Sequence, residues 1–313
     1  MKTSFIKDFQ AGDKLSNEQF AVKETRKGKT QDGRDYIDLI LADKTGDIAG
    51  KIWDGDIPHC DACSSGDIVT LSGLISEFRD KMQLKITFLQ RTTDYDLADF
   101  LSQSKKDQTA LWQIVEQAIA EVKNKFLRKL LDSFFGNEEF AERFRKAPAA
   151  EKMHHAYLGG LMEHTVEMLN IRQTVATDFP ELDHDLLIAG ILLHDIGKMD
   201  ELGVSHTIYR TTAGYLLSHI TLGALTVDKA IATIKDFPED LRLKVIHQMI
   251  SHHGQLDFGS PVKPMTREAI ALHYLDNLSA KMNSAEKAYS DNVGGEHDFS
   301  DFIYALDAKL YLK

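Results

Sequence analysis

The spacing of hydrophobic residues changes near residue 95, and this change constrains the fold more than any other feature of the chain. From residue 19 to residue 92 apolar side chains alternate with polar ones in short runs, which is typical of β-strands. Turn-forming residues separate the runs at 32–33, 44–46 and 79–81. We therefore expect five strands, at residues 19–30, 36–43, 47–53, 67–78 and 82–92. With a short irregular or helical piece at residues 55–65, they predict a small closed barrel of the OB type, although another five-stranded barrel fits the same periodicity.

A polar stretch follows, and beyond it the hydrophobic spacing becomes helical. Residues 92–108 predict a linker with one helical turn, and from Leu111 to Leu131 apolar residues recur every three or four positions along one stripe. Further helices are expected near residues 138–146, 152–176, 184–196, 213–235, 238–252, 266–283 and 299–311. The chain thus predicts an N-terminal OB-type β-barrel at residues 1–95, a linker at 96–109 and an all-α helical bundle at 110–313.

Histidine and carboxylate residues concentrate at the predicted helix ends of the all-α domain. In the stretch LLIAGILLHDIGK, the adjacent His194 and Asp195 end a strongly apolar helix just before a break at Gly197. Burying a charged aspartate there is costly unless a cation or hydrogen-bond donors compensate, and a metal ion supplies such a cation. Mixed imidazole and carboxylate donors suit manganese, iron, cobalt, nickel or zinc rather than magnesium alone.

Four segments of this domain, GGLMEHT, LLHDIGK, SHHG and LHYLDNL, together resemble the ordered ligand series of the HD phosphohydrolase superfamily. The resemblance implies a metal-dependent phosphohydrolase that holds one or two divalent ions. The implied ligands are His164, His194, Asp195 and Asp276 for one ion, and His219, His252 and His253 for a second. Asp195 would bridge the two ions and take part in catalysis. Two such ions stabilise both the attacking and the leaving oxygens of a phosphoryl displacement.

Three other residues of this domain are candidates for contact with the substrate. Lys198 falls one turn after His194 if the helix continues, where its ammonium would bind a phosphate and assist catalysis. The alternative interpretation of Lys198 is a solvated lysine at a helix end. His154 and His155 precede the GGL segment, and either would touch the substrate or line the core.

Four further residues lie near the predicted ligands in sequence. Arg210 and His206 belong to the loop before His219, where we expect a substrate-binding role for Arg210. His247 and His273 lie inside apolar helical stretches, and we interpret them as packing residues.

The predicted barrel offers a surface for a nucleic-acid strand. OB folds hold single strands through aromatic stacking and a few basic residues. The candidates are Tyr36, Trp53 and Phe78 for stacking, and Lys23, Arg26, Lys27, Lys29 and Arg34 for phosphates. The alternative interpretation places Trp53 and Phe78 in the barrel core and leaves the basic run as a solvated hairpin.

The order of the two domains points to a narrower family. With the segments DGRDYIDLILADKTGDIAGKIWD, HHAYLGGLMEHT and HDIGK, the whole chain resembles the YhaM-type 3′→5′ exoribonucleases of Gram-positive bacteria. That family implies manganese- or cobalt-dependent trimming of single-stranded RNA, and of DNA as a second substrate. Two other functions stay open: an HD phosphohydrolase acting on mononucleotides or a cyclic dinucleotide, and a non-catalytic binding protein with a structural metal. A strand-binding barrel argues against the first, and spare histidines argue against the second, because structural metal sites are usually closed.

Charge and composition bear on the binding partners and the cellular location of the protein. The net charge of −11 opposes generic electrostatic binding to nucleic acid, although the first 95 residues carry 14 basic against 16 acidic residues and are nearly balanced. The first residues contain no apolar core of signal-peptide length, and no stretch elsewhere approaches the length of a membrane span, so we expect a cytoplasmic protein with no membrane partner. Cys60 and Cys63 lack the two further ligands of a zinc site, and we interpret them as ordinary thiols. No pattern specifies an oligomeric state.

Overall fold

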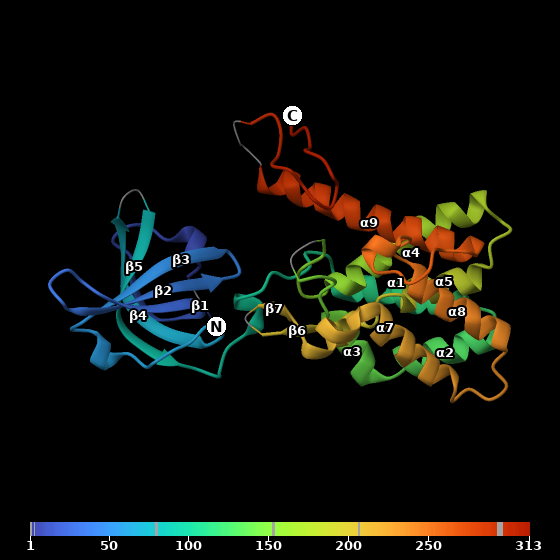
Figure 1. The fold of residues 1–313 in the computed structure, drawn as a ribbon, viewed down its shortest axis with the longest axis horizontal. Helices are drawn as coiled ribbons and strands as arrows, with labels where there is room; N and C mark the ends of the chain where they lie inside the picture. Colours follow the sequence, from blue (N-terminus) through green and yellow to red (C-terminus); the bar gives the residue numbers. More distant parts are fainter. Residues whose placement is uncertain (1, 3, 79–80, 152–153, 206, 293–296) are drawn as a thin grey trace. The chain divides into compact units, whose positions relative to one another are not determined.

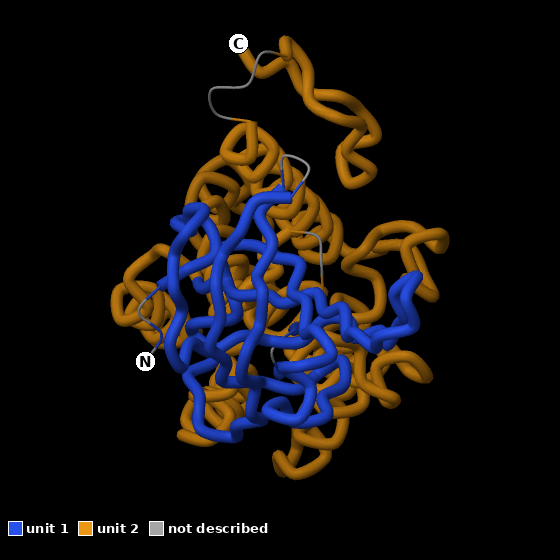
Figure 2. Tube along the Cα trace, turned by 90° about the vertical axis from the view of Figure 1, so that its left-hand side faces the viewer, with its two compact units in different colours: residues 1–103, 204–207 blue, residues 104–203, 208–313 orange. Residues whose placement is uncertain are grey.

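The computed structural model describes residues 2, 4–78, 81–151, 154–205, 207–292 and 297–313, and it divides the chain into two units. Unit 1 comprises residues 1–103 with 204–207, and unit 2 comprises residues 104–203 with 208–313 (Figure 2). The predicted turn residues Arg79 and Asp80, and His206, lie outside the described residues. Among the helices described, none is long and apolar enough to cross a membrane.

Unit 1 is a closed five-stranded barrel with the strand order β1-β2-β3-β5-β4 (Figure 1). The strands are β1 (Lys14–Lys29), β2 (Asp35–Asp43), β3 (Gly46–Trp53), β4 (Ile68–Phe78) and β5 (Lys81–Arg91). The β3–β5 pair is parallel and the other pairs are antiparallel, which with the short helical turn Ile57–His59 confirms the predicted OB-type barrel. Alternate residues fill the interior, for example Leu39 and Leu41 of β2.

Unit 2 is an all-helical bundle around one apolar core, as predicted. Its helices are α1 (Gln108–Glu121), α2 (Lys125–Phe135), α3 (Glu138–Lys146), α4 (Gly160–Asp178), α5 (His184–Leu193), α6 (Lys198–Glu201), α7 (Thr212–Ile231), α8 (Glu239–Ser251) and α9 (Arg267–Asp291). A small ribbon of β6 (Leu202–Val204) and β7 (Ile208–Arg210) joins α6 to α7. The long helix α9 packs against α4, α5 and α8 (Figure 1). The predicted linker contains one helical turn, Leu97–Asp99.

Three predicted helices differ from the structure. The stripe that begins at Leu111 is divided between α1 and α2, because the Asn124 side chain accepts hydrogen bonds from the first amides of α2 and starts a new helix. Helix α4 begins at Gly160 rather than near residue 152, after His155 and Gly159 adopt positive φ angles. No helix forms at residues 299–311. Aromatic side chains there remain exposed, so a helix would have no buried face, and the segment instead makes isolated β-bridges.

Candidate metal centre and strand-binding face

Asp195 lies at the middle of a buried cluster of histidines that comes from four different helices. Its Oδ2 atom is 3.3 Å from Nε2 of His194 and 3.8 Å from Nε2 of His164. Its Oδ1 atom is 3.5 Å from Nε2 of His219 and 3.6 Å from Nε2 of His252. All five side chains are buried. The sequence separates these residues by up to 88 positions, and the bundle brings the four imidazoles to one carboxylate.

Two groups of candidate ligands flank this carboxylate. In each group the donor atoms lie within 4.8 Å of one another: His164, His194 and Asp276 in the first, and His219, His252 and His253 in the second. In the first group, Oδ1 of Asp276 is 3.2 Å from Nε2 of His164. Since each oxygen of Asp195 faces a member of a different group, all seven predicted metal ligands come together in one centre.

The helix ends fix which nitrogen of two imidazoles carries the proton. His194 follows α5 and its Nδ1 lies 2.9 Å from the carbonyl oxygen of Ile191, while His252 follows α8 and its Nδ1 lies 2.6 Å from that of Met249. Each carbonyl belongs to the last turn of its helix and has no helical partner. A carbonyl only accepts, so Nδ1 donates, and in the neutral imidazole the Nε2 lone pair points toward Asp195.

Acceptor oxygens lie beside Nδ1 of the other three histidines. Ser279 Oγ donates to Glu167 Oε2 at 2.7 Å, so it must accept from Nδ1 of His164, which lies 2.9 Å away. Glu201 Oε2 lies 2.8 Å from Nδ1 of His219. Nδ1 of His253 donates to the carbonyl oxygen of Phe258 at 2.7 Å. Such outer partners fix the orientation of histidine ligands in metal sites.

This arrangement fits a bound divalent cation. The Nε2 atoms of His164, His194, His219 and His252 form no hydrogen bond with any residue in the described part of the chain. Their lone pairs face carboxylate oxygens at short range, which is unfavourable unless a cation lies between them. Burial holds the pKa of His252 well below its usual range, so this imidazole is neutral, as a ligand must be. Burial alone would raise the pKa of Asp195, but Lys198 and His194 keep it well below its usual range and the carboxylate is ionised.

Two backbone features allow this packing. Ser218 has φ 56° and ψ 161° inside α7, and this kink precedes His219. A non-glycine residue in such a conformation costs about 1–3 kcal/mol, and strain of this size is common at functional sites. Gly197 has right-handed helical φ/ψ, but an added Cβ would lie 2.1 Å from the carbonyl oxygen of His219. Gly197 is therefore needed for the close approach of α6 and α7, rather than for a helix break.

The predicted substrate-contact residues of unit 2 occupy different surroundings. Lys198 begins α6, is 8% exposed and places Nζ 2.6 Å from Oδ2 of Asp195, so it is not a solvated lysine. His154 lines a cavity beside the centre, and burial lowers its pKa to about 3. His155 is fully buried and faces Glu167 at 3.1 Å, away from Asp195.

Two more residues have roles that the sequence did not indicate. Arg210 lies on β7 with its guanidinium 3.7 Å from Glu201, the carboxylate that holds His219, and it does not line the cavity beside the centre. His273, interpreted from sequence as a packing residue, lines that cavity and places Nδ1 2.8 Å from the carbonyl oxygen of His252. His247 accepts a hydrogen bond from the backbone amide of Met265 and is a structural residue.

The barrel carries a basic and aromatic outer face at one end of β1, β2 and β3. Tyr36 and Trp53 are cross-strand neighbours with ring centroids 6.1 Å apart. Lys51 Nζ lies 4.2 Å from the centroid of Tyr36 and 5.0 Å from that of Trp53. Trp53 is 41% exposed and Phe78 is 61% exposed. The interpretation of Trp53 and Phe78 as core residues is therefore wrong, and Lys51 is an additional basic residue on this face.

The basic residues of the β1–β2 hairpin differ in their charge partners. Lys23 pairs with Asp47 at 2.7 Å, Lys29 with Asp35 at 2.6 Å, and Arg34 with Asp32 at 2.6 Å. Arg26 and Lys27 are exposed and form no ion pair with a described residue. Carboxylates thus neutralise three of the five predicted basic residues, and Arg26 and Lys27 carry the unpaired charge.

The two cysteines form no disulfide. Both are half-buried and pack against the barrel core, and burial raises the pKa of Cys60 to about 11.

Comparison with known proteins places the chain in a family. The HD domain model matches residues 161–281, which include all seven candidate ligands, and TraI_2, a model with a helicase description, matches residues 96–179. The 3′-5′ exoribonuclease YhaM of Bacillus velezensis is 34% identical over 95% of this chain and 94% of its own length. The YhaM enzymes of Bacillus subtilis and Halalkalibacterium halodurans are 34% and 36% identical over 93% and 97% of this chain, and 92% and 94% of their own lengths.

Among solved structures, the second OB-fold domain of replication protein A from Methanococcus maripaludis matches 31% of this chain and 99% of that domain, with 17% identity and a TM-score of 0.24. The sequence relatives span nearly the whole chain at identities above 30%, and their match includes both the barrel and the helical unit. This protein therefore belongs to the YhaM family of HD-domain 3′→5′ exoribonucleases.

Proposed function

We propose that this protein is a metal-dependent exonuclease that removes nucleotides from the 3′ end of single-stranded RNA in the cytoplasm, with single-stranded DNA as a second substrate. One observation carries the hydrolytic part of the proposal: four buried imidazole lone pairs converge on the ionised Asp195. The donor set of imidazole nitrogen and carboxylate oxygen suits manganese, with cobalt, iron, nickel and zinc as alternatives. The two groups of ligands around Asp195 support a site for two ions.

The residues of the chain have separate tasks in this proposal. A bound divalent ion supplies stabilisation of negative charge on the phosphoryl oxygens and lowers the pKa of a bound water. Lys198 neutralises part of the charge of Asp195 and faces the cavity beside the centre, where its ammonium also contacts a substrate phosphate. Ser279 and Glu201 hold His164 and His219 with their Nε2 lone pairs toward the centre.

The preference for a single strand rests on the barrel. Exposed aromatic rings at Trp53 and Phe78 offer stacking surfaces, and Tyr36 and Trp53 lie on β2 and β3, the strands with which OB folds bind oligonucleotides. The relatives are named for action on RNA at its 3′ end, and they match the barrel as well as the helical unit.

The function is tested by incubating manganese-loaded and metal-free protein with end-labelled RNA. We expect 5′-labelled single-stranded RNA to shorten stepwise, 3′-labelled RNA to release mononucleotides at once, and metal-free protein to be inactive. Single-stranded DNA, duplex RNA, mononucleotides and a cyclic dinucleotide are assayed in parallel. Hydrolysis of mononucleotides or the cyclic dinucleotide without RNA shortening would contradict the proposal and support a small-nucleotide phosphohydrolase.

The strand-binding part is tested by the salt dependence of RNA affinity. Replacing Arg26 and Lys27 with Gln should reduce the slope of log affinity against log salt by about 1.4, because each phosphate contact to a single strand contributes about 0.7. The matched control replaces Lys23 and Lys29, whose charges are already paired with Asp47 and Asp35, and should change the slope less. An unchanged slope in the Arg26/Lys27 variant would show that the hairpin does not contact the strand.

A further inference from the structure

A cavity of about 350 Å³ opens directly beside the metal centre. It is lined by Lys198, His253 and Asp276, which belong to the centre. It is also lined by Phe258, Asn277 and Lys281, which are not among the candidate ligands. A molecule in this cavity would therefore be in contact with the centre.

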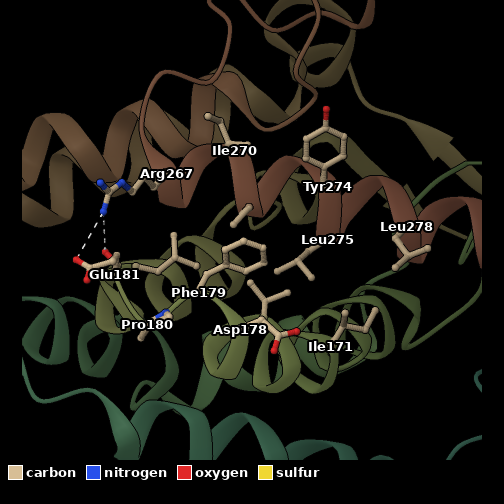
Figure 3. A pocket seen from close by; sticks show the side chains of 13 residues that line it. Ile171, Asp178, Phe179, Pro180, Glu181, Arg267, Ile270, Tyr274, Leu275 and Leu278 are labelled. Carbon is tan, nitrogen blue, oxygen red and sulfur yellow. Dashed lines mark hydrogen bonds and ion pairs between the residues drawn. The ribbon is translucent and has the colours of Figure 1, made fainter.

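This cavity differs from a second, larger hollow in unit 2 because it borders the metal centre. A larger hollow of about 640 Å³ lies between the end of α4 and α9, where Phe179, Tyr274 and Leu278 line it (Figure 3). Its lining is almost wholly apolar apart from a few charged groups at the edge, and no candidate metal ligand borders it. The smaller cavity has the polar and charged wall that a nucleotide requires.

Lys281 supplies the unpaired positive charge of this wall. The ammonium of Lys198 lies 2.6 Å from Asp195, whereas Lys281 is exposed and forms no ion pair with a residue in the described ranges. Lys281 follows Asp276 by five residues on α9, which places it about 7.5 Å further along the helix axis. A nucleotide whose scissile phosphate is at the centre would direct its far end toward this lysine.

Phe258 supplies an aromatic surface at a fixed place. It ends the short helical turn Leu256–Phe258, and its backbone carbonyl oxygen accepts the hydrogen bond from Nδ1 of His253. Its side chain lines the cavity and is 61% exposed. The ring is thus tied through its own backbone to a candidate ligand, and its open face is free for stacking with a base.

We propose that this cavity is the subsite for the 3′-terminal nucleotide, in which the base stacks on Phe258 and the terminal 3′ group contacts Lys281. Its volume is near the lower end for small-ligand pockets, which suits one nucleotide rather than several. Ala305 of the C-terminal segment forms part of its wall, beside Ala280 and Lys281. Because Lys281 is a cation without an ion-pair partner among the described residues, the subsite also accepts an end that carries a 3′-phosphate. This inference rests on the proposed function.

The base contact is tested with a cycle of two variants and two substrates. Phe258→Leu keeps the backbone carbonyl that holds His253 and should lower kcat/KM for RNA about tenfold, with unchanged metal content. The same variant should match the unsubstituted protein on RNA whose terminal nucleotide is abasic, because the contact is already missing. Phe179→Leu is the control, since Phe179 is also 61% exposed but lines the other hollow. It should leave both substrates unaffected.

The end contact is tested with RNA that ends in a 3′-hydroxyl or a 3′-phosphate. The unsubstituted protein should shorten both, and Lys281→Met should slow the 3′-phosphate substrate about tenfold more than the hydroxyl one, because only the phosphate forms an ion pair. Lys287→Met, also exposed on α9, is the control. The subsite would be overturned, but not the proposed function, by two results together. These are an equal loss of activity in Phe258→Leu on abasic and intact ends, and an equal loss in Lys281→Met on RNA with a 3′-hydroxyl and RNA with a 3′-phosphate. Failure of the unsubstituted protein to shorten any RNA would overturn the proposed function, and the subsite with it.

Discussion

Two clusters of histidine and carboxylate in the helical unit differ in how their charges are balanced. In the first, Lys106 Nζ lies 3.0 Å from Glu163 and 2.7 Å from Glu167, and His155 faces Glu167 at 3.1 Å. Burial alone would raise the pKa of Glu167, but hydrogen bonds from His155 and Lys106 lower it to about 2. Each carboxylate there faces a donor, so that cluster needs no ion.

The second cluster, around Asp195, has too few donors for its acceptors. Its one lysine, Lys198, pairs with Asp195, while the cluster also contains the buried carboxylate of Asp276 and four imidazole Nε2 atoms without a hydrogen-bond partner among the described residues. The two clusters are joined, because Ser279 accepts from His164 and donates to Glu167. The same residue types therefore serve as a support in one place and as candidate ligands in the other. The second cluster is distinguished by its four imidazole Nε2 atoms, which have no hydrogen-bond partner among the described residues.

The largest expected effect comes from removing the shared carboxylate. Asp195→Ala should reduce RNA hydrolysis by at least about 1000-fold and lower metal content, because the centre loses the group that faces both sets of histidines. Far-UV circular dichroism should stay nearly unchanged, since the apolar helices still bury their core. Activity and metal content are measured on the same preparation.

The matched variant in the supporting cluster is Glu167→Gln. It should retain metal but lose about 10-fold in activity, because Glu167 holds Ser279, the hydrogen-bond partner of His164. Full metal occupancy and activity in Asp195→Ala would contradict the assignment of the centre. A greater loss in Glu167→Gln than in Asp195→Ala would reverse the roles of the two clusters.

The sequence indicated the candidate ligands more clearly than the residues that hold them. His194 and Asp195 stand out because they follow a helix whose residues 186–193 are all buried, and His252-His253 likewise follow a helix end. Ser279 and Glu167 carry no such signal, because they are 112 residues apart and are joined by a single hydrogen bond. Glu201 has no distinguishing feature in the sequence, because its partners, Arg210 on β7 and His219 on α7, come close to it only in the folded chain.

In the barrel, the alternation of apolar and polar residues predicted the strands, but it did not predict whether each aromatic side chain lies in the core or on the surface. Trp53 ends β3 beyond the closed interior, so its place in the alternation did not make it a core residue. The absence of a helix at 299–311 has a similar cause, since apolar spacing predicts a helix only where a core is available to cover it.

A smaller effect is expected when the lysine is removed from the supporting cluster. Lys106→Met leaves Glu163 and Glu167 facing each other, and because Lys106 is about half exposed we expect a loss of about 2 kcal/mol in unfolding free energy at pH 7. Urea unfolding measures this loss, with Lys129→Met, an exposed lysine on α2, as the control. A loss no greater than that of the control would mean that solvent balances these carboxylates and that the contrast between the clusters does not depend on Lys106.

The smallest expected effect is the pH dependence that Glu167 gives to stability. The groups facing it are Lys106, His155 and Glu163, and its folded-state pKa of about 2 lies below the usual 4.5. A carboxylate with a lowered pKa stabilises the folded protein above the unfolded-state pKa, and this contribution is lost as pH falls from about 4.5 toward 2. The side chain is 26% exposed, so solvent screening reduces the pH-dependent part to about 1 kcal/mol. The unfolding free energies of the unsubstituted protein and Glu167→Gln, measured with urea, should therefore differ by a constant amount above pH 5. Below pH 4 this difference should shrink by about 1 kcal/mol. If the difference instead stayed constant down to pH 3, the cluster would be held by hydrogen bonds that do not depend on the charge of Glu167.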